Sequence, residues 1–129
     1  MSAKTILVAD DESHILSVVS LKLRNAGYRV LTAADGQEAL EVALAERPDL
    51  LITDYHMPRL SGLELCQRLR QDDATRAMPT IMLTARGYHL EPHDTEQSGI
   101  TKMLSKPFSP RHLLATVNEV LGVPPAVAA

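Results

Sequence analysis

Five short apolar runs alternate with amphipathic stretches along this chain, and that alternation constrains its fold more than any other feature. The runs cover residues 6–9, 28–33, 50–53, 80–83 and 102–104. Apolar runs of this length, rich in Ile, Leu and Val, are typical of parallel strands that are buried on both faces. The sequence therefore predicts an α/β fold with a five-stranded parallel sheet, right-handed crossovers and helices on both faces.

The stretches between the runs begin with residues that can cap helices. The expected caps are Asp11 or Ser13 before a helix to about residue 25, Asp35 with Glu38 before 36–46, Ser61 with Glu64 before a helix to about residue 70, and Ser109 with Pro110 before the last helix. Such side chains accept hydrogen bonds from the backbone N–H groups that a helix start leaves free. The stretch 86–99 is polar and weakly periodic, and Pro92 favours at most a short helix there.

Length and composition favour one domain without a nucleic-acid surface. The chain has 129 residues, of which 45% are hydrophobic, and its net charge of -3 gives no basic footprint for direct nucleic-acid binding. The single cysteine, Cys66, excludes an internal disulfide and is expected to be buried. No run could insert in a membrane and no signal-peptide pattern is present, so we expect a cytoplasmic protein. We predict a domain over 1–122 and a tail or start of a linker over 123–129.

Charged residues follow three of the apolar runs. Asp10 and Asp11 follow the first run, Asp54 follows the third and Lys106 follows the fifth. The carboxyl ends of parallel strands meet at one edge of a sheet, where open α/β folds bind their ligands. Taken singly, the aspartate pair fits an ordinary turn and helix cap, and the lysine fits an ordinary loop. Their joint occurrence is the specific signal, because carboxylates gathered at one edge repel each other unless a cation joins them.

Five motifs then indicate a family. They are Ile-Leu-Val-Ala-Asp-Asp-Glu at 6–12, Leu-Ile-Thr-Asp-Tyr-His-Met-Pro at 51–58, Ser-Gly at 61–62, Met-Leu-Thr-Ala at 82–85 and Ser-Lys-Pro-Phe at 105–108. In this order and spacing the chain resembles the CheY-like receiver domains of two-component response regulators over about residues 4–122. The resemblance implies a flavodoxin-like three-layer sandwich with strand order 2-1-3-4-5.

The resemblance also implies a phosphorelay site. Asp54 matches the phosphoacceptor, which takes a phosphoryl group from a phosphohistidine of a sensor histidine kinase or a histidine phosphotransfer protein. Asp11 and Asp54 match side-chain ligands of Mg²⁺, with the backbone carbonyl of His56 as a third ligand, and Asp10 acts through a metal-bound water. Mg²⁺ suits such a site because it prefers hard oxygen ligands and bridges to phosphate.

Two further site residues follow from the same resemblance. Lys106 matches the cation that pairs with Asp54 and later with a phosphoryl oxygen. Thr84 matches the hydroxyl that bonds the new phosphoryl group, and the small side chain of Ala85 lets the backbone come close. The Lys106–Pro107 bond matches a position where the family often has a cis peptide.

The expected function is a phosphorylation switch rather than a dedicated enzyme. Phosphorylation of Asp54, followed by slow self-dephosphorylation, would bias a surface that a downstream output domain or target protein binds. A protein-interaction module of the same fold that works without phosphorylation is the alternative, and an intact set of site residues argues against it. A Mg²⁺-dependent phosphatase needs a second carboxylate two residues after Asp54, where this chain has His56.

The chain departs from the family in the region that relays the switch. Met103 stands where an aromatic ring is common, which puts the usual threonine–aromatic relay in doubt. Pro92 and the weak apolar stripe of 86–99 predict a mobile fourth helix, and the fifth strand lacks the acidic residues of one dimerising subclass. His89 and His93 have the spacing of metal ligands, but Pro92 between them argues against a transition-metal site.

Overall fold

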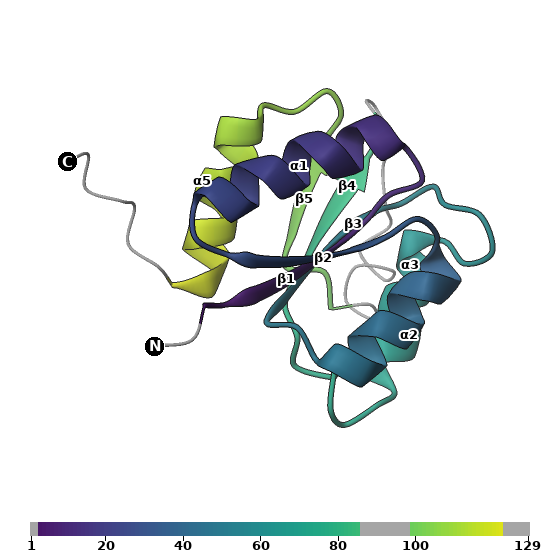
Figure 1. Ribbon diagram of the computed structural model, residues 1–129. Helices are drawn as coiled ribbons and strands as arrows, with labels where there is room; N and C mark the ends of the chain where they lie inside the picture. Colours follow the sequence, from purple (N-terminus) through teal and green to yellow (C-terminus); the bar gives the residue numbers. More distant parts are fainter. Residues whose placement is uncertain (1–2, 86–98, 123–129) are drawn as a thin grey trace.

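Five parallel strands form one sheet with helices on both faces (Figure 1). This structure, a computed structural model, describes residues 3–85 and 99–122. The strands are β1 (Thr5–Ala9), β2 (Arg29–Ala33), β3 (Leu50–Asp54), β4 (Thr80–Thr84) and β5 (Lys102–Ser105), and the described helices are α1 (Ser13–Asn25), α2 (Gly36–Glu46), α3 (Gly62–Arg70) and α5 (Pro110–Leu121). The strand order is β2-β1-β3-β4-β5, and every pair is parallel. The predicted fold class and strand order are confirmed.

The sheet separates two hydrophobic clusters. Successive side chains of a strand point to opposite faces, so Ile6 and Val8 of β1 join one cluster and Leu7 and Ala9 join the other. The first cluster includes residues of α1 and α5, and the second includes residues of α2 and α3, as the layers in Figure 1 show. Both faces of the central strands are therefore covered, which explains their continuous apolar sequence.

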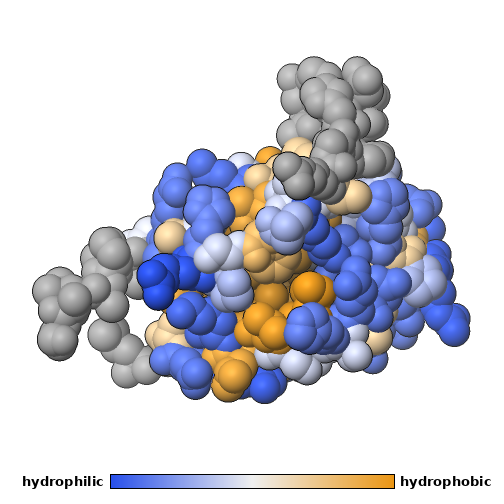
Figure 2. Space-filling model, turned by 90° about the horizontal axis from the view of Figure 1, so that it is seen from above, coloured by the Kyte–Doolittle hydropathy of each residue, from blue (hydrophilic) through white to orange (hydrophobic). Residues whose placement is uncertain are grey.

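Burial differs sharply between the middle and the edge of the sheet. All residues of β3 and β4 are buried, because each strand has a neighbour on both sides and helices on both faces. In β5, at the edge, three of the four residues are exposed. On the outer helices, α1 exposes Val18 and Leu21, and Figure 2 shows apolar surface among polar residues on this side of the molecule.

The cap predicted for α1 is wrong. The N-cap residue is Glu12, and its side chain makes no capping hydrogen bond. Neither Asp11 nor Ser13 has that role. The Glu12 N–H instead donates to Oδ1 of Asp10, at 2.9 Å, so an aspartate at the end of the strand accepts the bond.

The other three predicted caps are present. Ser61 and Glu64 form the reciprocal capping box of α3, and the Ser109 side chain accepts from the His112 N–H at the start of α5. For α2, Asp35 accepts from the Glu38 N–H at 2.8 Å. The Glu38 carboxylate, however, accepts from the N–H of Ala34 rather than from that of Asp35.

Some predictions concern residues that the structure does not describe. The short helix and the mobility expected around Pro92, the His89–His93 pair and the tail over 123–129 lie outside the described residues. Cys66 is buried as predicted, and burial raises the pKa of its thiol to about 12. None of the helices in the described ranges has the length and apolar composition that a membrane crossing requires.

Candidate functional site

Three carboxylates meet at the carboxyl edge of the sheet. Ala9 lies opposite Thr53 in the β1–β3 pair, so the residues that follow them, Asp10 and Asp54, come together at the strand ends. Asp11 is next along the chain, and one oxygen from each of the three carboxylates lies within 4.8 Å of the others. Asp10 and Asp54 are buried, whereas Asp11 is exposed.

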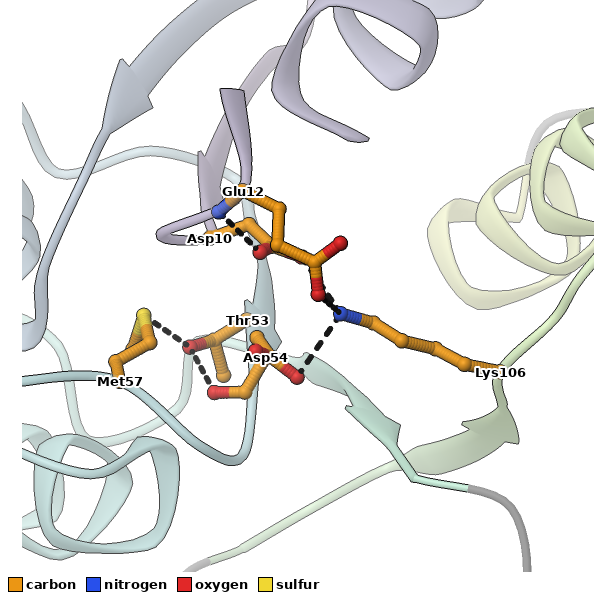
Figure 3. Close-up of polar contacts among 6 residues, drawn as sticks. All are labelled: Asp10, Glu12, Thr53, Asp54, Met57 and Lys106. Carbon is orange, nitrogen blue, oxygen red and sulfur yellow. Dashed lines mark hydrogen bonds and ion pairs between the residues drawn. The ribbon is translucent and has the colours of Figure 1, made fainter. Parts of the chain in front are cut away.

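The Lys106 ammonium group lies among carboxylates (Figure 3). Its Nζ is 3.2 Å from Oδ2 of Asp10 and 3.3 Å from Oδ1 of Asp54. A further carboxylate, that of Glu12, places Oε1 at 3.3 Å from the same Nζ. The lysine side chain is 18% exposed, so these attractions act in a partly dry environment where they are stronger than in water.

An open cleft gives access to this group of charges. The cleft has a volume of about 220 Å³, and its lining residues are Asp11, Glu12, Asp54, His56, Ala85 and Lys106. The exposed carboxylate of Asp11 and the edge of Asp54 thus face the same space.

Burial and repulsion shape the protonation of the cluster. Burial raises the pKa of Asp10, although the Glu12 N–H and Lys106 oppose the shift. Burial and then the charge of Asp10 raise the pKa of Asp54. Burial alone would lower the pKa of Lys106, but the charges of Asp10 and Asp54 outweigh it and raise that pKa. The carboxylates of the cluster therefore carry more negative charge than the Lys106 ammonium group neutralises.

Tight backbone packing fixes Asp54. The N–H of the next residue, Tyr55, donates to the Leu83 carbonyl at 2.8 Å, which extends the β3–β4 pairing past the strand end. The Gly62 N–H donates to the Tyr55 carbonyl, also at 2.8 Å. A Cβ atom at Gly62 would collide with the Asp54 carbonyl oxygen. The start of α3 therefore needs glycine at this position, so that it can pack against the backbone of Asp54.

Thr84 and Lys106 are linked through the backbone. Thr84 ends β4, is buried and precedes Ala85 of the cleft. The Lys106 N–H donates to the Thr84 carbonyl at 2.7 Å, which carries the β4–β5 pairing up to the site. The Lys106–Pro107 peptide bond is cis, as expected. Met103 pairs with Met82, two residues before the Thr84–Ser105 pair, and is 37% exposed.

His56 presents its side chain outward. The residue is exposed, and its ring packs edge-on against Tyr55 with ring centroids 4.7 Å apart. It also lines the cleft. The role of its backbone carbonyl as a metal ligand stays a prediction.

Two residues that contact the site, Thr53 and Glu12, were not predicted from the sequence. Thr53 is buried, and its hydroxyl donates to the Asp54 carbonyl at 3.0 Å and contacts the Met57 sulfur at 3.9 Å. Glu12 reaches Lys106 from the start of α1. The run Asp10-Asp11-Glu12 was the available signal for the second contact, since a third acidic residue at a strand end adds to the same local charge.

The oxygen atoms present fit a hard divalent cation. Three carboxylates converge within 4.8 Å, and the described cluster offers oxygen donors rather than the sulfur or imidazole ligands that softer metals favour. Mg²⁺ takes one or two carboxylates and keeps several waters, which suits a cluster open on one side through Asp11. The chemistry of the donors therefore fits the cation expected from the sequence.

Comparison with known protein families agrees with this geometry. Residues 6–118 match the family described as "Response regulator receiver domain". Among curated proteins, the phosphate regulon transcriptional regulatory protein PhoB of Pseudomonas aeruginosa is 40% identical over 94% of the chain. The alkaline phosphatase synthesis transcriptional regulatory protein PhoP of Bacillus subtilis is 41% identical over 92%. The chain covers 53% and 48% of these two proteins, so it spans about half their length.

Solved structures show the same fold. The chemotaxis response regulator CheY4 of Vibrio cholerae superposes with a TM-score of 0.86 at 37% identity, over 92% of this chain and 99% of that one. The receiver domain of sensor histidine kinase PA1611 from Pseudomonas aeruginosa superposes with a TM-score of 0.84 at 30% identity, over 94% and 99%. That structure has a magnesium ion coordinated in its active site cleft.

Proposed function

The chain belongs to the response regulator receiver domain family, and from that premise we propose that it accepts a phosphoryl group on Asp54 in a Mg²⁺-dependent reaction. The observation that carries the proposal is the meeting of three carboxylates and one ammonium group at the open edge of the sheet. Asp54 is buried at the end of β3, lines the cleft, and is followed by Tyr55, whose N–H and carbonyl are both hydrogen-bonded to neighbouring backbone. These properties suit a nucleophile that must meet a bound donor in one geometry.

The reaction moves one phosphoryl group between two side chains. An Asp54 carboxylate oxygen attacks the phosphorus of a phosphohistidine on a partner protein. A P–O bond forms, the P–N bond breaks, and its electron pair returns to the imidazole nitrogen. The product is an acyl phosphate, and slow attack by water on it regenerates the carboxylate and releases inorganic phosphate. The domain is in this sense a phosphoryl acceptor rather than a dedicated enzyme.

Lys106 and Thr84 assist from the same side of Asp54, because β4 and β5 both follow β3 in the sheet order. In this structure Lys106 pairs with Oδ1 of Asp54, and the same ammonium group can follow the charge onto a phosphoryl oxygen after transfer. The Thr84 hydroxyl lies at the end of the neighbouring strand, from which it can donate to the new group. Both residues then bind the phosphorylated form in ways that the free form lacks, as a switch requires.

Asp11 and Asp54 would hold Mg²⁺ directly, with the His56 carbonyl as a third ligand and Asp10 acting through water. When bound, the ion neutralises charge that would keep an anionic donor away from the carboxylates. The raised pKa of Asp10 and Asp54 supports this assignment, because groups that resist ionisation together gain most from a shared cation.

The partners follow from the same assignment. A sensor histidine kinase or a histidine phosphotransfer protein would supply the phosphoryl group, and an output domain or a separate target would bind the switched surface. The full-length relatives named above are transcriptional regulators about twice as long, so DNA binding would belong to another domain. A cytoplasmic location completes the proposal.

Mass spectrometry tests the proposal. The chain is incubated with Mg²⁺ and a small phosphodonor such as acetyl phosphate. We expect a mass increase of one phosphoryl group that is lost in Asp54→Asn and on removal of Mg²⁺. An adduct that still forms in Asp54→Asn would contradict the assignment of Asp54 as the phosphorylated residue. No adduct under conditions that label other receivers would favour the alternative, an interaction module that works without phosphorylation.

A further inference from the structure

Glu12 contacts the site but has no part in the transfer described above. Its Oε1 lies 3.3 Å from Nζ of Lys106, the same distance that separates that nitrogen from Oδ1 of Asp54. The position of Glu12 is fixed by its own N–H, which donates to Oδ1 of Asp10 at 2.9 Å. Figure 3 shows the ammonium group with Glu12 and Asp10 on one side and Asp54 on the other. The Glu12 carboxylate therefore competes with Asp54 for the ammonium group of Lys106.

We propose that Glu12 is a positioning residue that draws Lys106 away from the incoming phosphoryl group and so slows phosphorylation of Asp54. The inference rests on the proposed function. Of the three carboxylates that contact Lys106, those of Asp10 and Asp54 are 0% and 6% exposed, whereas that of Glu12 is 58% exposed. Water can hydrate Glu12 when the lysine leaves it. The ion pair is therefore one that the lysine can exchange for a phosphoryl oxygen at small cost.

Two physical effects of the Glu12 charge act in the same direction. The carboxylate competes for an ammonium group that the phosphoryl oxygen needs, and it adds negative charge to the cleft through which an anionic donor enters. Removing the charge weakens both effects. The Glu12 end of this ion pair is 58% exposed, and ion pairs with a hydrated partner contribute about 1 kcal/mol or less, so we expect the phosphorylation rate of Glu12→Gln to rise about two- to fivefold.

A local structural role of the side chain is separable from this effect. Glu12 is the N-cap residue of α1, but its side chain makes no capping hydrogen bond there. Glutamine has the same length and can keep the packing of the stem. Glu12→Gln should therefore leave the free energy of unfolding nearly unchanged while it changes the rate. A charge effect on an exposed residue also falls with ionic strength, which a packing effect does not.

The experiment measures the rate of phosphoryl adduct formation with acetyl phosphate for wild type, Glu12→Gln and a control, Glu41→Gln. Glu41 is an exposed residue of α2 with the same charge. Mg²⁺ is kept saturating for each variant, with its affinity measured by calorimetry, because loss of a carboxylate near the site weakens cation binding. We expect a faster rate in Glu12→Gln alone, and a smaller difference from wild type at high salt.

Other results would overturn the inference. An equal or slower rate in Glu12→Gln does so, as does an increase of the same size in Glu41→Gln or an increase that salt leaves unchanged. In these cases wild type is still labelled at Asp54 and the proposed function stands. If wild type takes no phosphoryl group, the proposed function fails and the inference fails with it.

Discussion

The strand that carries the proposed phosphoacceptor, together with its neighbour β4, and the strand that leads to the lysine lie in opposite environments. Every residue of β3 and β4 is buried, whereas three of four residues of β5 are exposed. Asp54 is thus fixed by the packing of the core. Lys106 depends instead on a backbone bond to Thr84 and on ion pairs with carboxylates. The site combines a rigid acidic half with a basic half at the edge of the sheet.

The largest expected effect tests the rigid half. Ile52 of β3 is fully buried in the cluster beneath α1 and α5, so Ile52→Ala should lower the free energy of unfolding by about 2–5 kcal/mol. Met103→Ala in β5, where the side chain is 37% exposed, should lower it by less than about 1 kcal/mol. Urea unfolding gives both values. Similar losses for the two variants would remove the contrast between the strands.

A smaller effect is expected where the two regions are joined. The Arg70 guanidinium, at the end of α3, donates to the carbonyls of Arg76, Met78 and Gly99. Gly99 lies just before β5. The Arg70 side chain therefore links the backbone that leads into this edge strand to the end of α3. Arg70→Ala should cost about 1–3 kcal/mol, because it leaves carbonyls without their donor.

Amide hydrogen exchange shows whether the Arg70→Ala change loosens the start of β5 or the whole fold. The Thr101 N–H donates to the Thr80 carbonyl at 2.8 Å at the start of the β4–β5 pairing. Its exchange should speed up in Arg70→Ala more than that of amides in β3. Arg68→Ala, at an exposed position of the same helix, is the control. Equal acceleration in both strands would show that Arg70 stabilises the whole fold and not the junction.

The smallest effect concerns the acidic half itself and depends on pH. The pKa of Asp10 is raised by burial, so the native state binds its proton more tightly than the unfolded chain does. Without Mg²⁺, this group's contribution to stability falls as pH rises from the ordinary aspartate pKa through the raised native pKa, and is level above it. Asp10→Asn lacks this dependence and should be more stable near neutral pH by about 1 kcal/mol.

Unfolding measurements between about pH 4 and 7 in Mg²⁺-free buffer test the sign. The stability difference between Asp10→Asn and wild type should grow with pH. A difference that shrinks as pH rises would mean that the ion pair with Lys106 outweighs burial in the folded protein. Added Mg²⁺ should stabilise wild type more than the variant.

The fold was predictable because the strands are buried on both faces. Runs such as 6–9 and 50–53 have no polar alternation, and their regular alternation with amphipathic stretches favours a covered parallel sheet. The predicted ends of the strands were less accurate. β3 includes Asp54 and β4 includes Thr84, so each strand ends one residue later than predicted. A charged or polar residue resembles a loop in a pattern of hydropathy, although the backbone ladder continues through it.

The carboxylate cluster was predictable for a related reason. Strand ends gather at one edge of a parallel sheet, so Asp10, Asp11 and Asp54 had to lie close together. The contact of Glu12 with Lys106 was not, because it depends on the reach of two long side chains from residues 94 positions apart. The prediction of the α1 cap was wrong for a local reason. The Glu12 N–H donates to the carboxylate of Asp10, a residue of the preceding strand end, and neither Asp11 nor Ser13 caps the helix.

The strand order has a consequence for the protein while it is being synthesised. β1 is the first of these strands to be synthesised, and it lies inside the sheet between β2 and β3. All three aspartates precede the lysine in the chain, Asp10 by 96 residues and Asp54 by 52. During that interval a nascent chain that brings the first three strands together must tolerate their mutual repulsion or collect a cation from solution. Divalent cations should therefore speed the folding of this domain as well as support the proposed chemistry.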